Sequence, residues 1–473
     1  MEERAAIPVE PPRPDPTLSY WQDPPASLAR HRTTPNLPAS TDILIIGSGI
    51  TGASTAHYLL SQPSPPSVVL LEARTASSGA TGRNGGHTKH ASYREFEDNA
   101  KTQGEAEAAK IARFEYDCMK AVHRFAREHG VKCDSWEGDT VDVIYHQGQW
   151  EKAKSAVAKM KKILGENDPV ADYKFWTAEE TQKHFLAEGS LGSVSYEAGS
   201  LSAYKFAIGT LELAIKSGLN LQTETPALAI TKHESGRTGW IVETPRGEVQ
   251  AQRVVLATNG YTAHLYPQLQ GVIVPLRGHM TAQRPGKALP ATGLSTTYSF
   301  IYDDGYEYMI SRPQGSRFAG DIAIGGGSTK APNAGIQEFG TTDDANTDPI
   351  ILDYLKSVTV EYFGSSWGED DPDGRLRKAW TGIMGYSADG FPLIGPVPGE
   401  AGLYISASFQ GSGMVLSLLS AKALVAMING NDNQHLDRWF PKAFRMGPDR
   451  LERKFHGRLH TTAPMDLELK GLV

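Results

Sequence analysis

The chain has 473 residues, 40% hydrophobic and 21% charged, which suits a soluble globular protein of two or three domains with a substantial core. A net charge of −7 without a basic tract argues against nucleic acid and membranes as partners, and no apolar run has membrane-spanning length. Two cysteines are too few for a disulfide framework or a cysteine-based zinc site, and without a hydrophobic signal region they indicate a cytoplasmic protein.

The first 40 residues are rich in proline and poor in apolar side chains. This composition predicts an extended N-terminal arm, with Tyr20 and Trp21 as an anchor onto the body of the protein. A mobile tail is the alternative interpretation of the same stretch.

The next segment, residues 42–72, has the pattern of a dinucleotide-binding βαβ unit. An apolar β-branched strand (residues 42–46) precedes Gly47, Gly49 and Gly52, which have the spacing G-x-G-x-x-G. A helix, whose N-terminus favours phosphate, and a second strand follow, and Glu72 ends that strand twenty residues after Gly52. An acidic residue at this position accepts ribose hydroxyls, so FAD or NAD is expected rather than NADP.

The polar, glycine-rich loop after Glu72 has no helical or strand period and is positioned to wrap a cofactor. Its motif SGATGRNGGH, residues 78–87, resembles the GASGRNGGQ loop of γ-glutamylputrescine-oxidase-like members of the D-amino-acid oxidase/sarcosine oxidase family of FAD enzymes. The resemblance implies that this loop covers the pyrophosphate and one edge of the flavin. It implies flavin contacts from Ser78, Thr81, Arg83, Asn84, Gly85 and Gly86.

The middle of the chain alternates helices and strands. One amphipathic helix is expected over residues 100–130, followed by a strand over 139–146 and by helices over 151–166 and 177–185. A further helix is expected after the GSLSAYK stretch (199–205). Strands are expected within residues 219–234, 239–252 and 253–262. Cys118, His123 and His129 are expected to be packing or surface residues, and no metal site is expected. By the family resemblance, the backbone of residues 226–228 lies beside the adenine, and Asn259 is inserted in the turn before Gly260.

Residues 272–328 contain alternating, aromatic-rich strands with turn dipeptides, which predict an antiparallel sheet covered by a helix within residues 343–364. The following part of the chain contains Gly382, Asp389, Gly390, Pro392 and Gly395 in this order. A strand comes next, and then a second glycine turn, FQGSGM, at which a long apolar helix begins. This order of motifs resembles the C-terminal part of the same family. The helix N-terminus favours FAD over NAD, because its N–H groups can stabilise negative charge on a reduced flavin. Family members often have His where this chain has Ser412.

The fold class expected is therefore α/β, with a Rossmann-type, GR2-like FAD-binding domain and an antiparallel β-sheet plus helices as substrate domain, interleaved in sequence. The boundaries are 1–40 for the arm, 41–136, 191–271 and 375–445 for the FAD domain, 137–190 and 272–374 for the substrate domain, and 446–473 for a C-terminal tail. The expected cofactor-binding residues are Gly47, Ser48, Gly49, Ile50, Thr51, Gly52, Glu72, Ala73, Arg74, Ser78, Thr81, Arg83, Asn84, Gly85, Gly86, His87, Ala227, Leu228, Thr258, Asn259, Gly260, Gly382, Gly411, Ser412, Gly413 and Met414.

The resemblance implies oxidation of a C–N bond in a small-molecule amine or N-substituted amino acid, by hydride transfer to flavin N5 and hydrolysis of the imine, with O2 as acceptor and H2O2 as product. A dehydrogenase that passes electrons to a carrier, or a flavin-binding protein with a degenerate site, is the alternative. The catalytic candidates are Arg277, Tyr306, Tyr308 and Trp380, with His279, Tyr302 and Arg312 as further substrate contacts. Tyr306 and Tyr308 share one face of a strand, with Glu307 on the other. Ordinary core packing is the competing interpretation for each.

Two features of the cofactor chemistry depend on single positions. No cysteine follows Cys133, which excludes the cysteinyl flavin bond of some sarcosine-oxidase-type enzymes. The histidine that bonds flavin in the dimethylglycine-dehydrogenase branch corresponds to Arg83, so noncovalent FAD is expected. A histidyl bond through His87, four residues further on, is the alternative. Monomeric sarcosine oxidases place a lysine near N5 to assist O2, where this chain has Ala323, which weakens the oxidase assignment.

Overall fold

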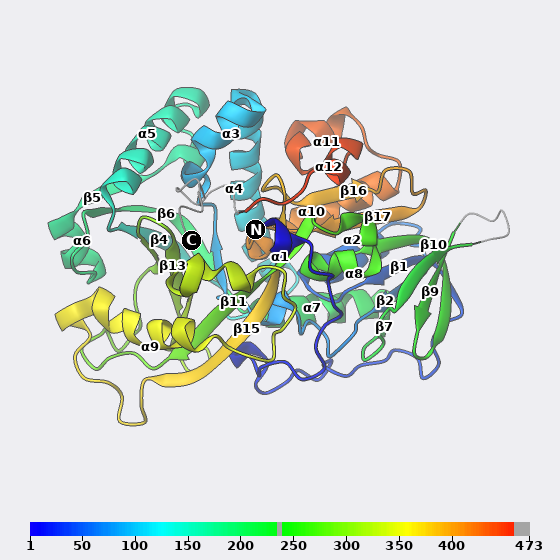
Figure 1. Ribbon diagram of the computed structural model, residues 1–473, viewed down its shortest axis with the longest axis horizontal. Helices are drawn as coiled ribbons and strands as arrows, with labels where there is room; N and C mark the ends of the chain where they lie inside the picture. Colours follow the sequence, from blue (N-terminus) through cyan, green and yellow to red (C-terminus); the bar gives the residue numbers. More distant parts are fainter. Residues whose placement is uncertain (234–238, 458–473) are drawn as a thin grey trace, which may run out of the picture.

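The computed structural model describes residues 1–233 and 239–457 and contains two β-sheets side by side (Figure 1). In the first sheet, five strands run parallel in the order β17 (Leu403–Ala407), β10 (Gly247–Leu256), β1 (Ser40–Ile46), β2 (Val68–Leu71) and β7 (Asn220–Gln222). Strand β16 (Leu393–Pro396) adds an antiparallel edge, and β8 (Ala229–Lys232) and β9 (Trp240–Thr244) extend from β10. This is the Rossmann-type sheet expected from the sequence.

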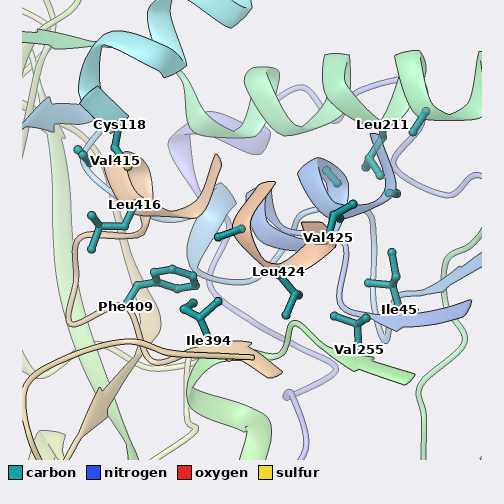
Figure 2. Close-up of a cluster of buried hydrophobic side chains, with 14 of the residues drawn as sticks. Ile45, Cys118, Leu211, Val255, Ile394, Phe409, Val415, Leu416, Leu424 and Val425 are labelled. Atoms are coloured by element: carbon teal, nitrogen blue, oxygen red, sulfur yellow. The ribbon is translucent and has the colours of Figure 1, made fainter. Parts of the chain in front are cut away.

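Both faces of the first sheet are covered because its parallel strands are apolar on both sides. Helices α2 (Ile50–Leu60), α7 (Ala203–Lys216) and α10 (Gly413–Ile428) pack on one face. Figure 2 shows this core, in which Ile45 and Val255 of the sheet lie near Leu424 and Val425 of α10. Alternate residues such as Leu44 and Leu256 pack on the other face against β9 and the segment that includes α8 (Thr262–Leu265).

The second sheet has the order β15 (Leu376–Ser387), β11 (Ile273–Gln283), β14 (Ile322–Gly325), β13 (Tyr306–Ser311), β12 (Thr297–Ile301), β4 (Trp136–Ile144), β6 (Gly192–Ser200) and β3 (His87–Lys89), with β5 (Lys174–Thr177) beside β6. Its neighbours are antiparallel except for β12 and β4, which are parallel. Helix α9 (Pro349–Phe363) packs on this sheet through Val358, Tyr362 and Phe363.

Helices α3 (Phe96–Gln103), α4 (Glu105–Glu128), α5 (Gln147–Leu164) and α6 (Ala178–Phe185) lie around the β4–β6 end of the second sheet (Figure 1). The single helix expected over residues 100–130 is wrong in one respect, because the chain breaks at Gly104. That residue has a φ of +86°, which ends α3 and begins α4 in a new direction.

The sheets divide the chain differently from the expected domain boundaries. The expected boundaries place β3, β6 and β15 in the FAD domain, but all three strands pair within the second sheet. Strand β15, drawn in gold in Figure 1, pairs with β11 from Ile273 opposite Ser387 to Gln283 opposite Leu376. Backbone pairing with distant strands, which no local pattern encodes, is the physical reason for this difference.

The N-terminal arm lies on the body of the protein, begins with the short helix α1 (Glu2–Ala5), and buries both Tyr20 and Trp21. This agrees with the anchor interpretation and not with a mobile tail. At the other end, α11 (Gln434–Trp439) and α12 (Pro448–Glu452) follow α10. Part of the expected C-terminal tail, residues 458–473, lies outside the described residues.

Candidate cofactor and active site

A cavity of about 650 Å³ is lined by both sheets and by the loops that join them. The glycine turn before α2, the loop 79–87, the turn 257–261 and the start of α10 form one part of its wall. Strand β13, the loops at 302–305 and 326–329, the segment 91–95 and the start of α5 form another. A cavity of this size accommodates a large cofactor or ligand.

The turn after β1 needs glycine at three positions because neighbouring atoms pack too closely there for a Cβ. An added Cβ would lie 2.5 Å from the Ala257 carbonyl oxygen at Gly47, where φ is +106°, and 1.8 Å from the Gly47 oxygen at Gly52. At Gly49 it would lie 2.8 Å from Thr81 Oγ1, which accepts a hydrogen bond from the Ile50 N–H at 3.0 Å. The N-terminus of α2 therefore faces the cavity with only small groups around it, which suits an anionic ligand.

Glu72 follows β2 and lines the same part of the cavity. Its carboxylate accepts hydrogen bonds from the backbone N–H of Ser48 at 3.1 Å, from Ser48 Oγ at 2.6 Å and from the Arg74 N–H at 2.9 Å. These bonds fix the carboxylate beside the glycine turn. Ala227 and Leu228 also line the cavity.

A second helix N-terminus opens onto the cavity at α10, where Gly411, Ser412, Gly413 and Met414 form the wall. Asn259 holds this turn, because its side-chain oxygen accepts hydrogen bonds from the N–H groups of Ser408 at 3.0 Å and Phe409 at 3.3 Å. Asn259 itself has a φ of +46°, a conformation that asparagine tolerates. The two helices also meet directly, since Thr51 Oγ1 donates to Ser417 Oγ at 3.2 Å.

Most of the expected cofactor residues lie in the cavity wall, and four lie behind it: Gly52, Ser78, Gly86 and Gly260. Arg83 contributes to the wall, but its guanidinium donates to the carbonyl oxygens of Ser78, Thr17 and Thr381 and to Thr17 Oγ1. Its hydrogen bonds therefore stabilise the loop itself.

Among the substrate candidates, Tyr306, Tyr308, His279 and Tyr302 line the cavity. Glu307 lies on the opposite face of β13, fully buried, and accepts a hydrogen bond from Tyr302 Oη at 2.7 Å and one from Tyr362. The alternation expected along this strand is therefore present.

Three other candidates are corrected by the structure. Arg277 is absent from the cavity wall, because it pairs with Glu338 at 2.7 Å and Asp343 at 3.2 Å. Trp380 is completely buried and donates its indole N–H to the Arg83 carbonyl at 2.7 Å. Arg312 donates to Asp134 at 2.8 Å and also lies outside the wall. Each of these side chains is used for packing or internal ion pairing.

The cavity contains a charged cluster that the sequence analysis missed, made of Lys89, Arg94 and Asp142. Lys89 Nζ lies 3.3 Å and Arg94 Nη2 2.6 Å from the buried carboxylate of Asp142, which also accepts from Tyr93 and Tyr196. Lys89 and Arg94 line the cavity, and the Arg94 guanidinium lies 4.8 Å from the centre of the Tyr306 ring. Two cations thus share one carboxylate at the side of the cavity formed by β13.

Burial sets the protonation of this cluster. Burial and the neighbouring Arg94 charge lower the pKa of Lys89 to about 7, against the opposing effect of Asp142. Burial raises the pKa of Asp142, but Arg94 and Lys89 outweigh it and hold that pKa well below its usual range. Glu115, which accepts a hydrogen bond from Ser92 in the cavity wall, has its pKa raised to about 8 by burial and by Glu95.

His87 lines the cavity, and its Nε2 lies 2.7 Å from Thr297 Oγ1. Among the described residues its Nδ1 has no hydrogen-bond partner, and burial holds the pKa of the ring well below its usual range. His90 lies outside the cavity wall, between the rings of Tyr116 and Tyr196.

The sequence pattern of the family described as FAD dependent oxidoreductase matches residues 42–427. The chain belongs to this family. A gamma-glutamylputrescine oxidoreductase of Escherichia coli is 20% identical over 84% of this chain and 86% of its own length. A probable oxidoreductase of Rhizobium meliloti is 27% identical, over 56% of this chain and 60% of that relative. The crystal structure of glycine oxidase from Geobacillus kaustophilus has a TM-score of 0.68 at 18% identity, and the match covers 87% of this chain and 99% of that one, so the fold is shared.

The residues of the cavity fit FAD. The glycine positions leave room for a pyrophosphate at the N-terminus of α2, the Glu72 carboxylate lies at the end of β2, and the N-terminus of α10 reaches the same cavity. In residues 1–233 and 239–457, the helices are too short or too polar to cross a bilayer. The same ranges contain no group of three or more His, Cys, Asp or Glu residues that could hold a metal ion.

Proposed function

We propose that this FAD-dependent oxidoreductase oxidises the C–N bond of an amine or amino acid. The observation that carries the proposal is the continuity of the cavity, which joins the glycine turn and both helix N-termini to the Tyr306–Tyr308 face and the Lys89–Arg94 cluster. Bound FAD supplies a hydride acceptor at flavin N5. The names of relatives that act on glycine and γ-glutamylputrescine point to the same substrate class.

The side chains of the cavity prepare an amine for oxidation. The half-buried Tyr308 and the buried Met280 give one side of the cavity an aromatic and apolar surface that excludes water. Removing water from an ammonium group lowers its pKa, which favours the neutral amine that can lose hydride. No side chain acts as a general base, because the lowered pKa lets the ammonium group pass its proton to solvent water before hydride transfer.

The Lys89–Arg94 cluster supports an amino acid over a simple amine. Below pH 7 the two cations and the Asp142 carboxylate carry one net positive charge, and both cations reach the cavity. An excess positive charge in a buried wall favours a substrate carboxylate through charge-assisted hydrogen bonds. The cluster therefore defines one end of the substrate, and the reacting C–N bond lies away from it.

Anaerobic reduction tests this function. The yellow protein is mixed under nitrogen with secondary amino acids, polyamines and γ-glutamyl-polyamines, and loss of flavin absorbance is followed. A substrate bleaches the flavin, whereas a flavin-binding protein with a degenerate site stays yellow with every compound. Amino acids should bleach it at lower concentration than the corresponding amines without the carboxylate.

Dioxygen is the acceptor we propose, and a dehydrogenase is the second candidate. The dehydrogenase is favoured because the resemblance to monomeric sarcosine oxidases places a lysine that assists O2 at Ala323, which here is a buried residue of β14 outside the cavity wall. Release of H2O2 in air after anaerobic bleaching supports the oxidase. Slow reoxidation in air together with fast reduction of an artificial electron carrier supports the dehydrogenase.

We also propose that FAD is held without a covalent bond. Acid precipitation should leave the yellow colour in the supernatant. A yellow pellet would contradict this, and the variant His87→Asn would then show whether His87, whose Nε2 lies 2.7 Å from Thr297 Oγ1, is the point of attachment.

A further inference from the structure

The N-terminal arm forms part of the wall of the cofactor cavity. Pro11 and Pro12 line the cavity together with Glu72 and Arg74. The next residue, Arg13, accepts a hydrogen bond at its carbonyl oxygen from Arg74 Nη1 at 3.0 Å. The arm is therefore fixed to the segment that follows β2, beside the carboxylate of Glu72.

Further along the arm, Thr17 holds the charged side chain of the cofactor loop. Arg83 Nη2 donates to the Thr17 carbonyl at 2.7 Å, and Arg83 Nη1 lies 3.1 Å from Thr17 Oγ1. The Thr17 N–H donates to the carbonyl of Asp344 at 2.8 Å, and the fully buried Asp344 carboxylate pairs with Arg74 at 3.0 Å. Without the arm, two of the four hydrogen bonds of Arg83 would be lost from a buried guanidinium.

Three successive carbonyl groups of the cofactor loop are held from outside the cavity. Ser19 Oγ donates to the Gly82 oxygen at 2.5 Å, Trp380 Nε1 to the Arg83 oxygen at 2.7 Å, and Trp21 Nε1 to the Asn84 oxygen at 2.5 Å. Tyr20, between the two arm donors, stacks on Trp380 with ring centres 6.2 Å apart. These bonds fix the three peptide planes that begin at the carbonyl groups of residues 82–84, and Arg83, Asn84 and Gly85 of this stretch line the cavity.

We propose that residues 9–22 are a structural part of the FAD site and that their hydrogen bonds to residues 82–84 determine how tightly FAD is retained. The proposal rests on FAD as the cofactor of the proposed function. The fixed carbonyl oxygens keep their negative dipole ends away from the cofactor side of the loop, where a flipped peptide would repel the pyrophosphate. Trp21, Ser19 and Thr17 act as positioning residues, because they touch the loop.

Trp21→Phe and Ser19→Ala test the proposal in the full chain. Each removes one donor to the loop, and Phe retains the aromatic packing of Trp21. Ser19→Ala also removes the acceptor of the Trp21 backbone N–H, which lies 3.1 Å from Ser19 Oγ. Leu18→Ala is the matched control, since Leu18 lies in the same segment and is 56% exposed. We measure the dissociation constant of FAD on the apoprotein by flavin fluorescence quenching. On the holoprotein, we compare the temperature of flavin release with that of helix loss.

Each test variant should raise the dissociation constant of FAD about tenfold, because the buried hydrogen bond to the loop is lost. Flavin should also be released several degrees below the loss of helix, whereas the wild-type chain and Leu18→Ala release it together with unfolding. FAD dissociation constants within twofold of wild type in correctly folded variants would overturn the proposal, as would an equal effect of Leu18→Ala. If Trp21→Phe does not fold, the smaller change Ser19→Ala decides. A wild-type chain that binds no FAD would instead contradict the cofactor assignment.

Discussion

Lys89, in the cavity wall, has its Nζ 3.3 Å from Oδ1 of the buried Asp142, and the same carboxylate is shared with Arg94. Because the pKa of Lys89 is lowered to about 7, the cluster carries one net positive charge below that pH and none above it. The affinity of the site for an anionic group therefore changes within the physiological pH range. This relationship leads to the first prediction.

The KM for a carboxylated substrate should rise as the pH increases from 6 to 8, since Lys89 loses its charge in this interval. In Lys89→Met this rise should disappear, and KM at pH 6 should already be about tenfold higher, because a charge-assisted hydrogen bond is worth about 1.5–3 kcal/mol. Steady-state kinetics across this pH range provide the measurement. Lys216→Met, at the exposed end of α7, serves as the control and should retain the wild-type profile. A Lys89→Met variant with the wild-type pH profile would refute the role of Lys89.

Glu115 gives a prediction for stability. Its pKa is raised from 4.5 to about 8, first by burial and then by Glu95, so the folded state holds a proton that the unfolded chain releases between these values. The free energy of unfolding should therefore fall as pH rises from 4.5 to 8. Glu115→Gln should remove this dependence and stabilise the protein by at least about 1 kcal/mol at pH 8, after a strong discount of the pKa shift. Urea unfolding at pH 5 and pH 8 measures the effect, and equal slopes with pH in both proteins would contradict it.

The glycine turn after β1 should not tolerate a Cβ at Gly52, where the added atom would lie 1.8 Å from the Gly47 oxygen. We expect Gly52→Ala to lower the free energy of unfolding by about 3 kcal/mol, because helix and turn must separate. Gly79→Ala is the matched change in the neighbouring loop, with φ of −77° and nothing within 4 Å of the added Cβ. It should alter stability by less than about 0.5 kcal/mol. Chemical unfolding of the two variant apoproteins measures the free energy of unfolding of each. Similar losses of stability in the two variants would be inconsistent with the packing argument.

Asn259 joins the turn after β10 to the turn before α10. Asn259→Ala removes the acceptor for the N–H groups of Ser408 and Phe409 and places alanine at a φ of +46°. We expect a loss of about 2–3 kcal/mol from the combined strain and unpaired donors. Asn259→Asp retains an acceptor and a residue that tolerates this conformation, so it should lose less than half as much. Thermal melting of both variants measures their stability. An equal loss of stability in Asn259→Ala and Asn259→Asp would show that the hydrogen bonds are unimportant.

The parts of the fold that are encoded locally could be predicted from the sequence. The strand, glycine turn and helix of residues 42–60 are one continuous segment, and the apolar and glycine pattern determines each part. The alternation of Tyr306, Glu307 and Tyr308 likewise follows from the period of a single strand. The break at Gly104 could have been noticed, because glycine interrupts an otherwise regular helical pattern there.

The charged cluster could not be found in this way, because Lys89 and Asp142 are 53 residues apart and meet only through the pairing of β3 and β4 with β6. The same limit explains the error at Arg277, whose partner Glu338 is 61 residues away and comes from outside the strand. From the sequence alone, an arginine on an aromatic-rich strand is a reasonable ligand-binding candidate, because the sequence does not show that a distant carboxylate pairs with it. The one signal for Lys89 and Arg94 was their position just after the cofactor loop.

The contact between Thr51 and Ser417 joins helix starts that are separated by 366 residues of chain. At ribosomal speeds of about 5–20 residues per second, this interval takes about 20–70 s to synthesise. During that time the nascent chain contains the FAD-binding glycine turn before α2 but not the second glycine turn that begins α10. Flavin loading is therefore a late event in biogenesis, and a truncated translation product that ends before α10 should emerge colourless.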